Sequence, residues 1–156
     1  QDIANNSGNA TLINSTEGTL YFEGSALSEA STTTRHISIS GGSTSNRLYF
    51  YYRTTGGFAF ASFVGGVLQA NISNSGIVTD NSKVACVWKE NDYALWVNGV
   101  EIGTDTNASV WSSGTLDRIN FAEPNGVSSI LFGKVKALVV YKEALTDEQL
   151  TCLTTI

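Results

Sequence analysis

Apolar and polar side chains alternate along several short stretches of the chain, each about as long as one β-strand. Because successive side chains of a strand point to opposite faces of a sheet, this alternation predicts strands with one buried face. Runs of Gly, Ser and Thr separate the stretches and are typical of turns. The first such stretches are predicted to be consecutive antiparallel strands at residues 19–23, 35–40, 47–53 and 58–64.

The clearest local signal is the pair Asn98-Gly99, which lies between two alternating apolar stretches. Both residue types tolerate the positive φ angles that a two-residue type I′ hairpin turn requires. Together with the apolar stretch before it, the hairpin predicts a three-stranded meander over residues 83–103. Two later strands are expected at residues 116–122 and 132–141.

The end of the chain changes from strand to helix spacing. Thr146 and Gln149 have the spacing of a helix-capping box, and apolar residues follow at Leu150, Leu153 and Ile156. Turn signals recur at intervals of about 8–12 residues, without alternating helical segments. We therefore predict one all-β domain over residues 1–156, a two-sheet antiparallel jelly-roll sandwich with a short C-terminal helix.

The charge and hydropathy of the chain exclude some classes of binding partner. Charged residues make up 15% of the chain, and 14 acidic against 9 basic residues give a net charge of -5. No run of Lys or Arg could neutralise a row of phosphates, so no nucleic-acid partner is predicted. No stretch approaches the ~20 consecutive apolar residues of a membrane span, so no membrane insertion is expected. The first residue is Gln1 rather than Met, which suggests a processed product or a piece of a longer polypeptide.

The two cysteines, Cys86 and Cys152, lie far apart and have no histidine near them in sequence, so a zinc site through sulfur is not predicted. Cys86 alternates with Val84 and Trp88, which predicts a small buried side chain. A disulfide between the two cysteines is the alternative that the sequence leaves open.

Two segments of the second half, residues 83–103 and 133–150, resemble concanavalin A-like, laminin G-like domains. The first segment has the "YVNG"-like hairpin of those domains, and the second has their closing strand and "LTDEE"-like helix start. The first half, around residues 15–23 and 35–47, is similar to versions found in bacteriophage virion and tail proteins. The resemblance implies the concanavalin A-like sandwich and a virion or extracellular location. It does not imply one ligand, because this fold carries lectins, glucanases, adhesion modules and spacers.

Catalysis is not predicted. Glucanases of this fold place paired carboxylates on one strand about 5 Å apart, in an E-x-D-x-x-E pattern that is missing here. The nearest candidates, Glu17 and Glu23, are separated by roughly 20 Å of extended chain. The single histidine, His36, has no nucleophile motif such as G-x-S-x-G to accompany it.

Calcium is a candidate cofactor, because the resemblance implies relatives that hold this ion with oxygen ligands on rim loops. Asp80 and Asp105 are the candidate ligands, since each lies in an expected loop beside an Asn. Asp and Asn are also the commonest turn residues, so a purely structural interpretation stays open.

Aromatic side chains suggest where a glycan could bind, since sugar rings pack on aromatic faces and need polar groups for their hydroxyls. Trp111 is the first candidate, with Asp105 and Asn107 nearby, because no strand or helix pattern predicts that its polar loop is buried. Trp88 and Trp96 fall within strands and are expected to pack in the core or on a sheet.

The strand at residues 47–53 provides a second candidate. Arg47, Tyr49, Tyr51 and Arg53 would share one strand face, opposite Leu48, Phe50 and Tyr52. This stripe is interpreted either as a solvated sheet face with ordinary cross-strand pairs or as a concave contact surface.

These observations lead to two functional hypotheses. The first is a non-catalytic recognition or structural module of a phage virion, phage tail or similar extracellular assembly that binds cell-surface carbohydrate. The alternative is a purely architectural module that docks on a neighbouring virion subunit or forms a homo-oligomer.

Overall fold

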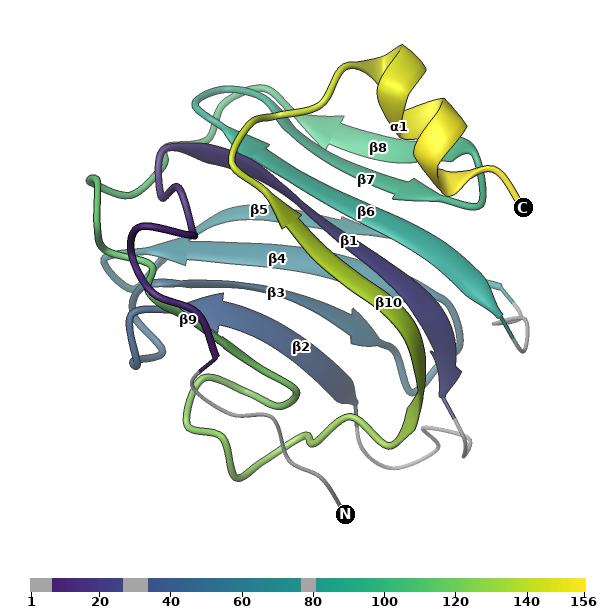
Figure 1. Cartoon of the computed structure of the whole chain (residues 1–156), viewed down its shortest axis with the longest axis horizontal. Coiled ribbons are helices and arrows are strands. Elements are labelled where there is room, and N and C mark those ends of the chain that lie inside the picture. Colours follow the sequence, from purple (N-terminus) through teal and green to yellow (C-terminus); the bar gives the residue numbers. More distant parts are fainter. Residues whose placement is uncertain (1–6, 27–33, 77–80) are drawn as a thin grey trace.

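Two antiparallel sheets of five strands pack face to face (Figure 1). The computed structural model describes residues 7–26, 34–76 and 81–156. We call the sheet with the order β10-β1-β6-β7-β8 the first sheet and the sheet with the order β5-β4-β3-β2-β9 the second sheet. The fold is therefore the all-β, jelly-roll sandwich that the alternation of side chains predicts.

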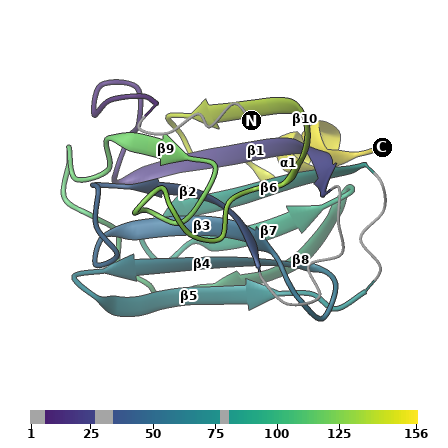
Figure 2. The ribbon, with the colours of Figure 1, turned by 90° about the horizontal axis from the view of Figure 1, so that it is seen from below.

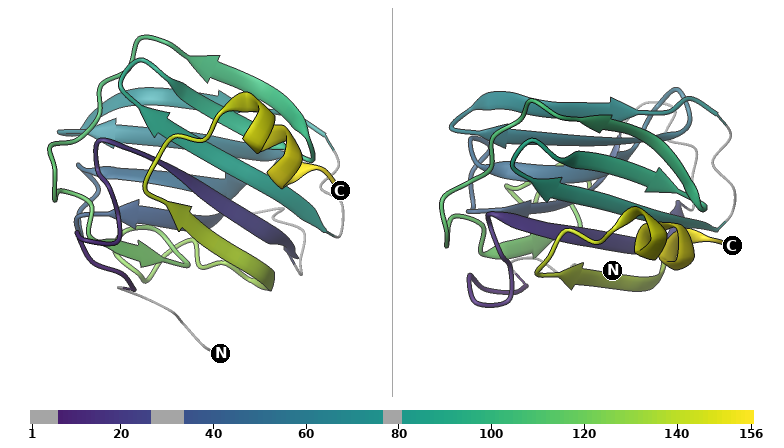
Figure 3. Two further views of the ribbon diagram at one scale, coloured as in Figure 1. Left: turned by 45° about the horizontal axis from the view of Figure 1, so that its top comes forward. Right: turned by 90° about the horizontal axis from the view of Figure 1, so that it is seen from above.

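The first sheet consists of β1 (Glu17–Ala26), β6 (Ser82–Lys89), β7 (Tyr93–Val97), β8 (Val100–Asp105) and β10 (Gly133–Tyr141). The second sheet consists of β2 (Arg35–Ser40), β3 (Arg47–Tyr52), β4 (Phe58–Val64), β5 (Val67–Ser73) and β9 (Arg118–Asn120). The helix α1 (Asp147–Thr154) covers the outer face of the first sheet (Figure 3). No helix of the described residues is long and apolar enough to cross a membrane.

Aromatic side chains fill the space between the sheets. Phe22 of β1 lies 5.3 Å from Phe50 of β3, between ring centroids, and meets Tyr52 edge-on at 6.2 Å. Phe58 continues the cluster 5.4 Å from Phe50. Rings of this size bury a large apolar area and prefer such tilted and edge-on contacts. The two sheets are therefore joined through side chains of β1, β3 and β4.

The predicted pairing of the first four strands is only partly correct. β2, β3 and β4 pair consecutively and antiparallel, as expected. β1 does not join them, because it pairs with β6 on one side and β10 on the other. Alternation shows which residues of a strand face inward, but it does not show which sheet the strand joins.

Two further differences concern short elements. β5 was not among the predicted strands, and it follows the Gly65-Gly66 turn as the partner of β4. Its exposed edge position leaves few buried side chains, which hides the alternation. The strand expected at residues 116–122 is shorter and covers only Arg118–Asn120.

The predicted hairpin and the predicted helix start are both confirmed. Asn98 and Gly99 have φ angles of 51° and 82°, as the turn between β7 and β8 requires. The Thr146 side chain accepts a hydrogen bond from the Gln149 backbone, and the Gln149 side chain bonds back to the cap. Leu150 is buried against Trp96 of β7, whereas Ile156 lies beyond the helix and is exposed.

The cysteines form no disulfide. Cys86 is buried between the sheets together with Val84 and Trp88, as its alternation predicts, and Cys152 is exposed on α1. The first sheet separates them, because Cys86 faces the core and α1 packs on the opposite face. Trp88 and Trp96 are also buried, one on each side of this sheet, which agrees with their predicted packing roles.

Replacing Phe50 should test the aromatic contact between the sheets. We expect Phe50→Ala to lower the free energy of unfolding by about 3–5 kcal/mol, because it removes a buried ring and leaves a cavity. Phe50→Leu keeps most of the volume and should cost less than about 2 kcal/mol. Urea titrations of both variants measure the difference, and a stability of Phe50→Ala equal to that of the wild type would show that ring packing at this position is unimportant.

Candidate functional site

The outer face of the second sheet presents a cluster of aromatic and basic side chains. Because Leu48, Phe50 and Tyr52 of β3 point into the core, the residues between them point outward. Cross-strand register then brings residues of β2 and β4 beside them. We call this cluster the aromatic face, and it comprises His36 of β2, Arg47, Tyr49 and Tyr51 of β3, and Phe63 of β4.

Small neighbours leave the two tyrosines accessible. Tyr49 lies opposite Ala61 and Tyr51 lies opposite Ala59 on β4. Both alanines are buried and add little height to the face, whereas both tyrosines are half-buried. The rings therefore keep part of their surface available to a ligand.

Ring contacts fix the arrangement of the face. The His36 ring stacks on Tyr49, with centroids 5.0 Å apart and planes 7° apart, and lies 5.1 Å from Tyr51. The Arg47 guanidinium carbon lies 4.9 Å from the centroid of Tyr49 and 4.6 Å from that of Phe63. Guanidinium groups bind favourably over aromatic faces at such distances. The charge of Arg47 is thus held beside the rings.

Two hydrogen-bonding nitrogens of the aromatic face are unused. Arg47 Nε and His36 Nδ1 are buried and have no hydrogen-bond partner among the described residues. The other ring nitrogen of His36, Nε2, lies 2.7 Å from the hydroxyl of Thr34. Buried polar atoms without a partner are rare in folded proteins and require an explanation. Both atoms have almost no accessible surface, so they report tight packing under the face rather than a contact offered to a ligand.

The loop between β9 and β10, residues 121–132, borders the aromatic face (Figure 2). The Ser38 hydroxyl of β2 donates to the carbonyl of Ala122 at 2.7 Å, and the His36 backbone N–H donates to the carbonyl of Ser129 at 2.9 Å. Asn120 donates its side-chain N–H to the carbonyl of Pro124 at 3.1 Å. The loop is therefore fastened to the same strand that carries His36.

Glu123 is the acidic residue of this loop that acts on the aromatic face. Burial lowers the pKa of His36 to about 4, and the Glu123 carboxylate opposes this effect while the Arg47 charge adds to it. Burial also raises the pKa of Tyr49, against the effect of Arg47 and with that of Glu123. At neutral pH His36 is thus neutral, and Arg47 and Glu123 act on it in opposite directions.

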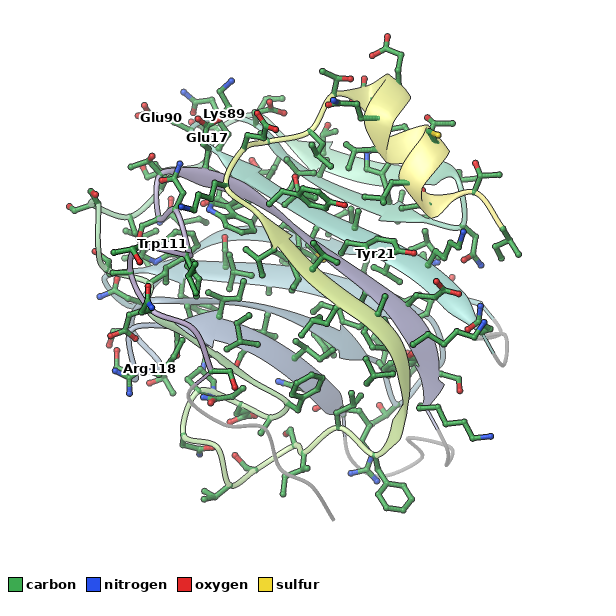
Figure 4. The ribbon with its side chains drawn as sticks, viewed as in Figure 1. Glu17, Tyr21, Lys89, Glu90, Trp111 and Arg118 are labelled. Carbon is green, nitrogen blue, oxygen red and sulfur yellow. The ribbon has the colours of Figure 1, made fainter. Side chains whose placement is uncertain are left out.

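The prediction that Trp111 is available to a ligand is wrong. Its side chain is only 2% exposed and belongs to the core, and its indole N–H donates to the carbonyl of Phe63 at 2.8 Å. Figure 4 shows it at one end of the sandwich. The polar loop that carries Trp111 closes this end, so tertiary packing buries a ring that the local pattern leaves unassigned.

The other predicted site residues are distributed over different parts of the fold. Asp105 ends β8 in the first sheet, and its carboxylate accepts the backbone N–H of Asn107 at 3.0 Å, as in an Asx turn. Arg53 lies just beyond β3 and donates to the carbonyl of Asn74 at 2.6 Å. Of the predicted stripe, Arg47, Tyr49 and Tyr51 remain together on the aromatic face.

The described residues do not come together as a set of ligands for calcium. Residues 7–26, 34–76 and 81–156 contain no group of three or more His, Cys, Asp or Glu side chains that could hold a metal. Asp80 lies outside the described residues. The turn role of Asp105 accounts for its position, and calcium binding stays a prediction.

Sequence reasoning missed three members of the site. His36 and Phe63 join the aromatic face through strand register, which a single alternating stretch does not reveal. Glu123 follows no periodic pattern, because it lies in an irregular loop. Its neighbour Pro124, the only proline, and the pair Asn125-Gly126 are local signals of a chain turn there.

The comparisons with known proteins agree with this architecture. A family model described as "Concanavalin A-like lectin/glucanases superfamily" matches residues 25–151. The chain belongs to this superfamily. No curated protein matches its sequence significantly.

Solved structures share the fold at low sequence identity. The CBM40 of the Ruminococcus gnavus IT-sialidase, bound to alpha2,3 sialyllactose, is similar with a TM-score of 0.77 and 20% identity over 100% of this chain and 96% of that one. The leech intramolecular trans-sialidase has a TM-score of 0.77 and 18% identity, covering 100% of this chain and 27% of that one. A SAP-like pentraxin from Limulus polyphemus has a TM-score of 0.69 and 17% identity, covering 94% of this chain and 72% of that one. Similarity at this level shows the fold alone.

The burial of His36 should make folding pH-dependent. An unfolded histidine has a pKa near ~6.5, whereas the folded chain lowers the pKa of His36 to about 4, so the unfolded state binds more protons between these values. The free energy of unfolding should therefore fall by about 2 kcal/mol from pH 7.5 to 5 through this group.

His36→Gln should remove this part of the pH dependence, as measured by urea titrations of both proteins at several pH values. The wild-type chain has one histidine, so its ring signals can be titrated directly by NMR. A ring that titrates near its usual pKa would contradict the buried position.

Proposed function

We propose that this domain is a non-catalytic carbohydrate-binding module that holds an acidic glycan on its aromatic face. The observation that carries the proposal is the guanidinium group of half-buried Arg47, which is held over the ring of Tyr49 beside half-buried Tyr51. A sugar ring can pack its C–H groups on the tyrosines while an acidic substituent accepts hydrogen bonds from the guanidinium group. One cluster thus offers both contacts that an acidic sugar needs.

The similar structures support a glycan as the ligand. The CBM40 of the Ruminococcus gnavus IT-sialidase is bound to alpha2,3 sialyllactose in one structure and to alpha2,6 sialyllactose in another, and both share this fold over nearly the whole chain. Sialyllactose carries one carboxylate, which a guanidinium group can bind. This agreement makes sialyllactose a suitable first ligand to test.

The carboxylates on β1 support a non-catalytic role. Glu23 accepts hydrogen bonds from Asn81 at 3.3 Å and from Lys136 at 3.2 Å. Hydrogen bonds from these two side chains lower the pKa of Glu23, whereas a glycosidase acid needs a raised pKa. Glu17 lies at the opposite end of the same strand, so the two carboxylates do not form an acid/base pair.

The assembly that carries this domain is a separate question, for which the expectation comes from the sequence. Display on a phage virion, a phage tail or another extracellular assembly stays a prediction. Binding of the purified domain to whole bacterial cells, and its loss when the cells are stripped of surface glycans, would connect the module to such a setting.

The architectural alternative has one observation in its favour. β10 is an edge strand of the first sheet, and Phe132, Val135 and Val139 in or next to it are 48%, 41% and 38% exposed. Exposed apolar side chains on an edge can pack against a second copy or a neighbouring subunit. Size measurements in solution would favour this alternative if a stable multimer formed without any glycan affinity.

Substitutions on the aromatic face test the proposed site. We expect Tyr49→Ala to weaken binding of an acidic glycan at least about 10-fold, because it removes a stacking surface and the ring under Arg47. Arg47→Gln should abolish the preference for 3′-sialyllactose over its carboxamide, which has the same sugars but no negative charge. Titration calorimetry with both sugars measures these changes.

Tyr141→Ala is the matched control, because Tyr141 lies on β10 of the first sheet, away from the aromatic face. Its affinity for 3′-sialyllactose should remain within about 2-fold of the wild type. A glycan array without any acidic ligand, or equal losses in Tyr49→Ala and Tyr141→Ala, would contradict the proposal.

A further inference from the structure

We propose that Glu123 is a specificity-determining residue of the aromatic face, which makes the site accept a sugar with one anionic group and reject one with a second anionic group nearby. This inference rests on the proposed function and adds the chemical class of the ligand. It also predicts that the accepted sugar carries a hydroxyl or amide N–H beside its anionic group, as a donor to Glu123.

The charges of Glu123 and Arg47 both act on the rings of the aromatic face. Glu123 and Arg47 both act electrostatically on His36, and both act on Tyr49. These two rings stack on each other at the middle of the aromatic face. A ligand above the rings would therefore lie within reach of one positive and one negative charge.

Glu123 is held in place by hydrogen bonds within its own loop. One carboxylate oxygen accepts the hydroxyl of Ser128 at 3.1 Å, and the other accepts the hydroxyl of Ser129 at 3.1 Å. The backbone closes the same loop, since Glu123 N–H donates to the carbonyl of Ser128 at 3.0 Å. A fixed carboxylate can discriminate between ligands, because it does not need to be ordered when the ligand binds.

No cation of the described residues is paired with Glu123, and its carboxylate keeps part of its capacity to accept hydrogen bonds. The ion pairs among the described residues join Arg118 to Asp117 and Lys136 to Glu23, and none includes Glu123. An ionised carboxylate has about four acceptor sites, of which the two serine hydroxyls occupy two. The remaining sites can accept a ligand hydroxyl or amide N–H, whereas a second ligand anion would be repelled.

Hydrogen bonds join this loop to β2, the strand that carries His36. Ser129 has a positive φ of 50°, an unusual conformation for a residue with a side chain, and its carbonyl accepts the backbone N–H of His36. Ser38, two residues along the same strand, anchors Ala122 next to Glu123. The carboxylate is thus positioned relative to β2 by contacts on both sides of it.

The test compares two ligands that differ by one anionic group, namely 3′-sialyllactose and the same trisaccharide with a sulfate on its galactose. We expect the wild-type domain to bind 3′-sialyllactose at least about 10-fold more tightly than the sulfated form. Glu123→Gln keeps the shape of the side chain and removes its charge. This variant should bind 3′-sialyllactose more weakly and the sulfated form more tightly, so that the two affinities differ by less than about 3-fold.

Glu90→Gln is the matched control, because it makes the same change of net charge at the exposed turn after β6 (Figure 4). Its preference should equal that of the wild type. A preference that falls equally in Glu90→Gln and Glu123→Gln would overturn the inference, because overall charge would then explain it.

An independent readout tests whether Glu123 faces the rings. Because the Glu123 carboxylate raises the pKa of His36, Glu123→Gln should lower that pKa further, as measured by NMR. An unchanged pKa would overturn the inference. Ser129→Ala is a second variant for the case that Glu123→Gln does not fold. It keeps the charge of Glu123 and removes one of the hydrogen bonds that hold it, so the preference for 3′-sialyllactose should decrease, and an unchanged preference would contradict the inference.

The outcomes separate this inference from the proposed function. If the wild-type domain binds neither ligand nor any other acidic glycan, the proposed function fails. If it binds both ligands equally well and Glu123→Gln changes neither affinity, the proposed function stands and the role of Glu123 is refuted.

Discussion

The contact between Phe22 of β1 and Phe50 of β3 is the interaction on which the other features of this domain depend. It joins the two sheets through strands that pair with different partners, and it fixes which side of β3 faces the core. Because side chains alternate along a strand, burying Phe50 forces Tyr49 and Tyr51 to the outside. The same packing that stabilises the sandwich therefore also exposes the rings of the candidate site.

The outer faces of the two sheets differ in how they are completed. On the first sheet, α1 covers Trp96 and neighbouring small residues with Leu150, so this face becomes part of a second hydrophobic cluster. On the second sheet, the described chain adds only the loop between β9 and β10, which leaves the aromatic face half-buried. Two buried nitrogens of this face have no hydrogen-bond partner among the described residues, an arrangement that costs stability.

Membership of the concanavalin A-like lectin/glucanase superfamily agrees with the fold, but this architecture carries several functions. The features that distinguish this domain are those of the site itself, namely the charge of Arg47 held over two rings and the carboxylate of Glu123 held by two serine hydroxyls. Preorganised charges of both signs favour a ligand that carries one acidic group among neutral hydroxyls. The low overall charge density of the chain is consistent with this local selectivity, because few other charges compete with the site.

The sequence by itself determined the local elements, since their causes lie within a few residues. The Asn98-Gly99 turn, the capping box at Thr146 and the inward direction of Leu48, Phe50 and Tyr52 all follow from turn chemistry, capping and alternation. Only the tertiary structure decided that β1 pairs with β6 and β10 and not with β2, the next strand in the sequence. It also buried Trp111 in the core at one end of the sandwich, a position that the local sequence pattern does not predict. His36, Phe63 and Glu123 join the tyrosines only through strand register and loop closure, which are long-range contacts and leave no periodic signal in the sequence.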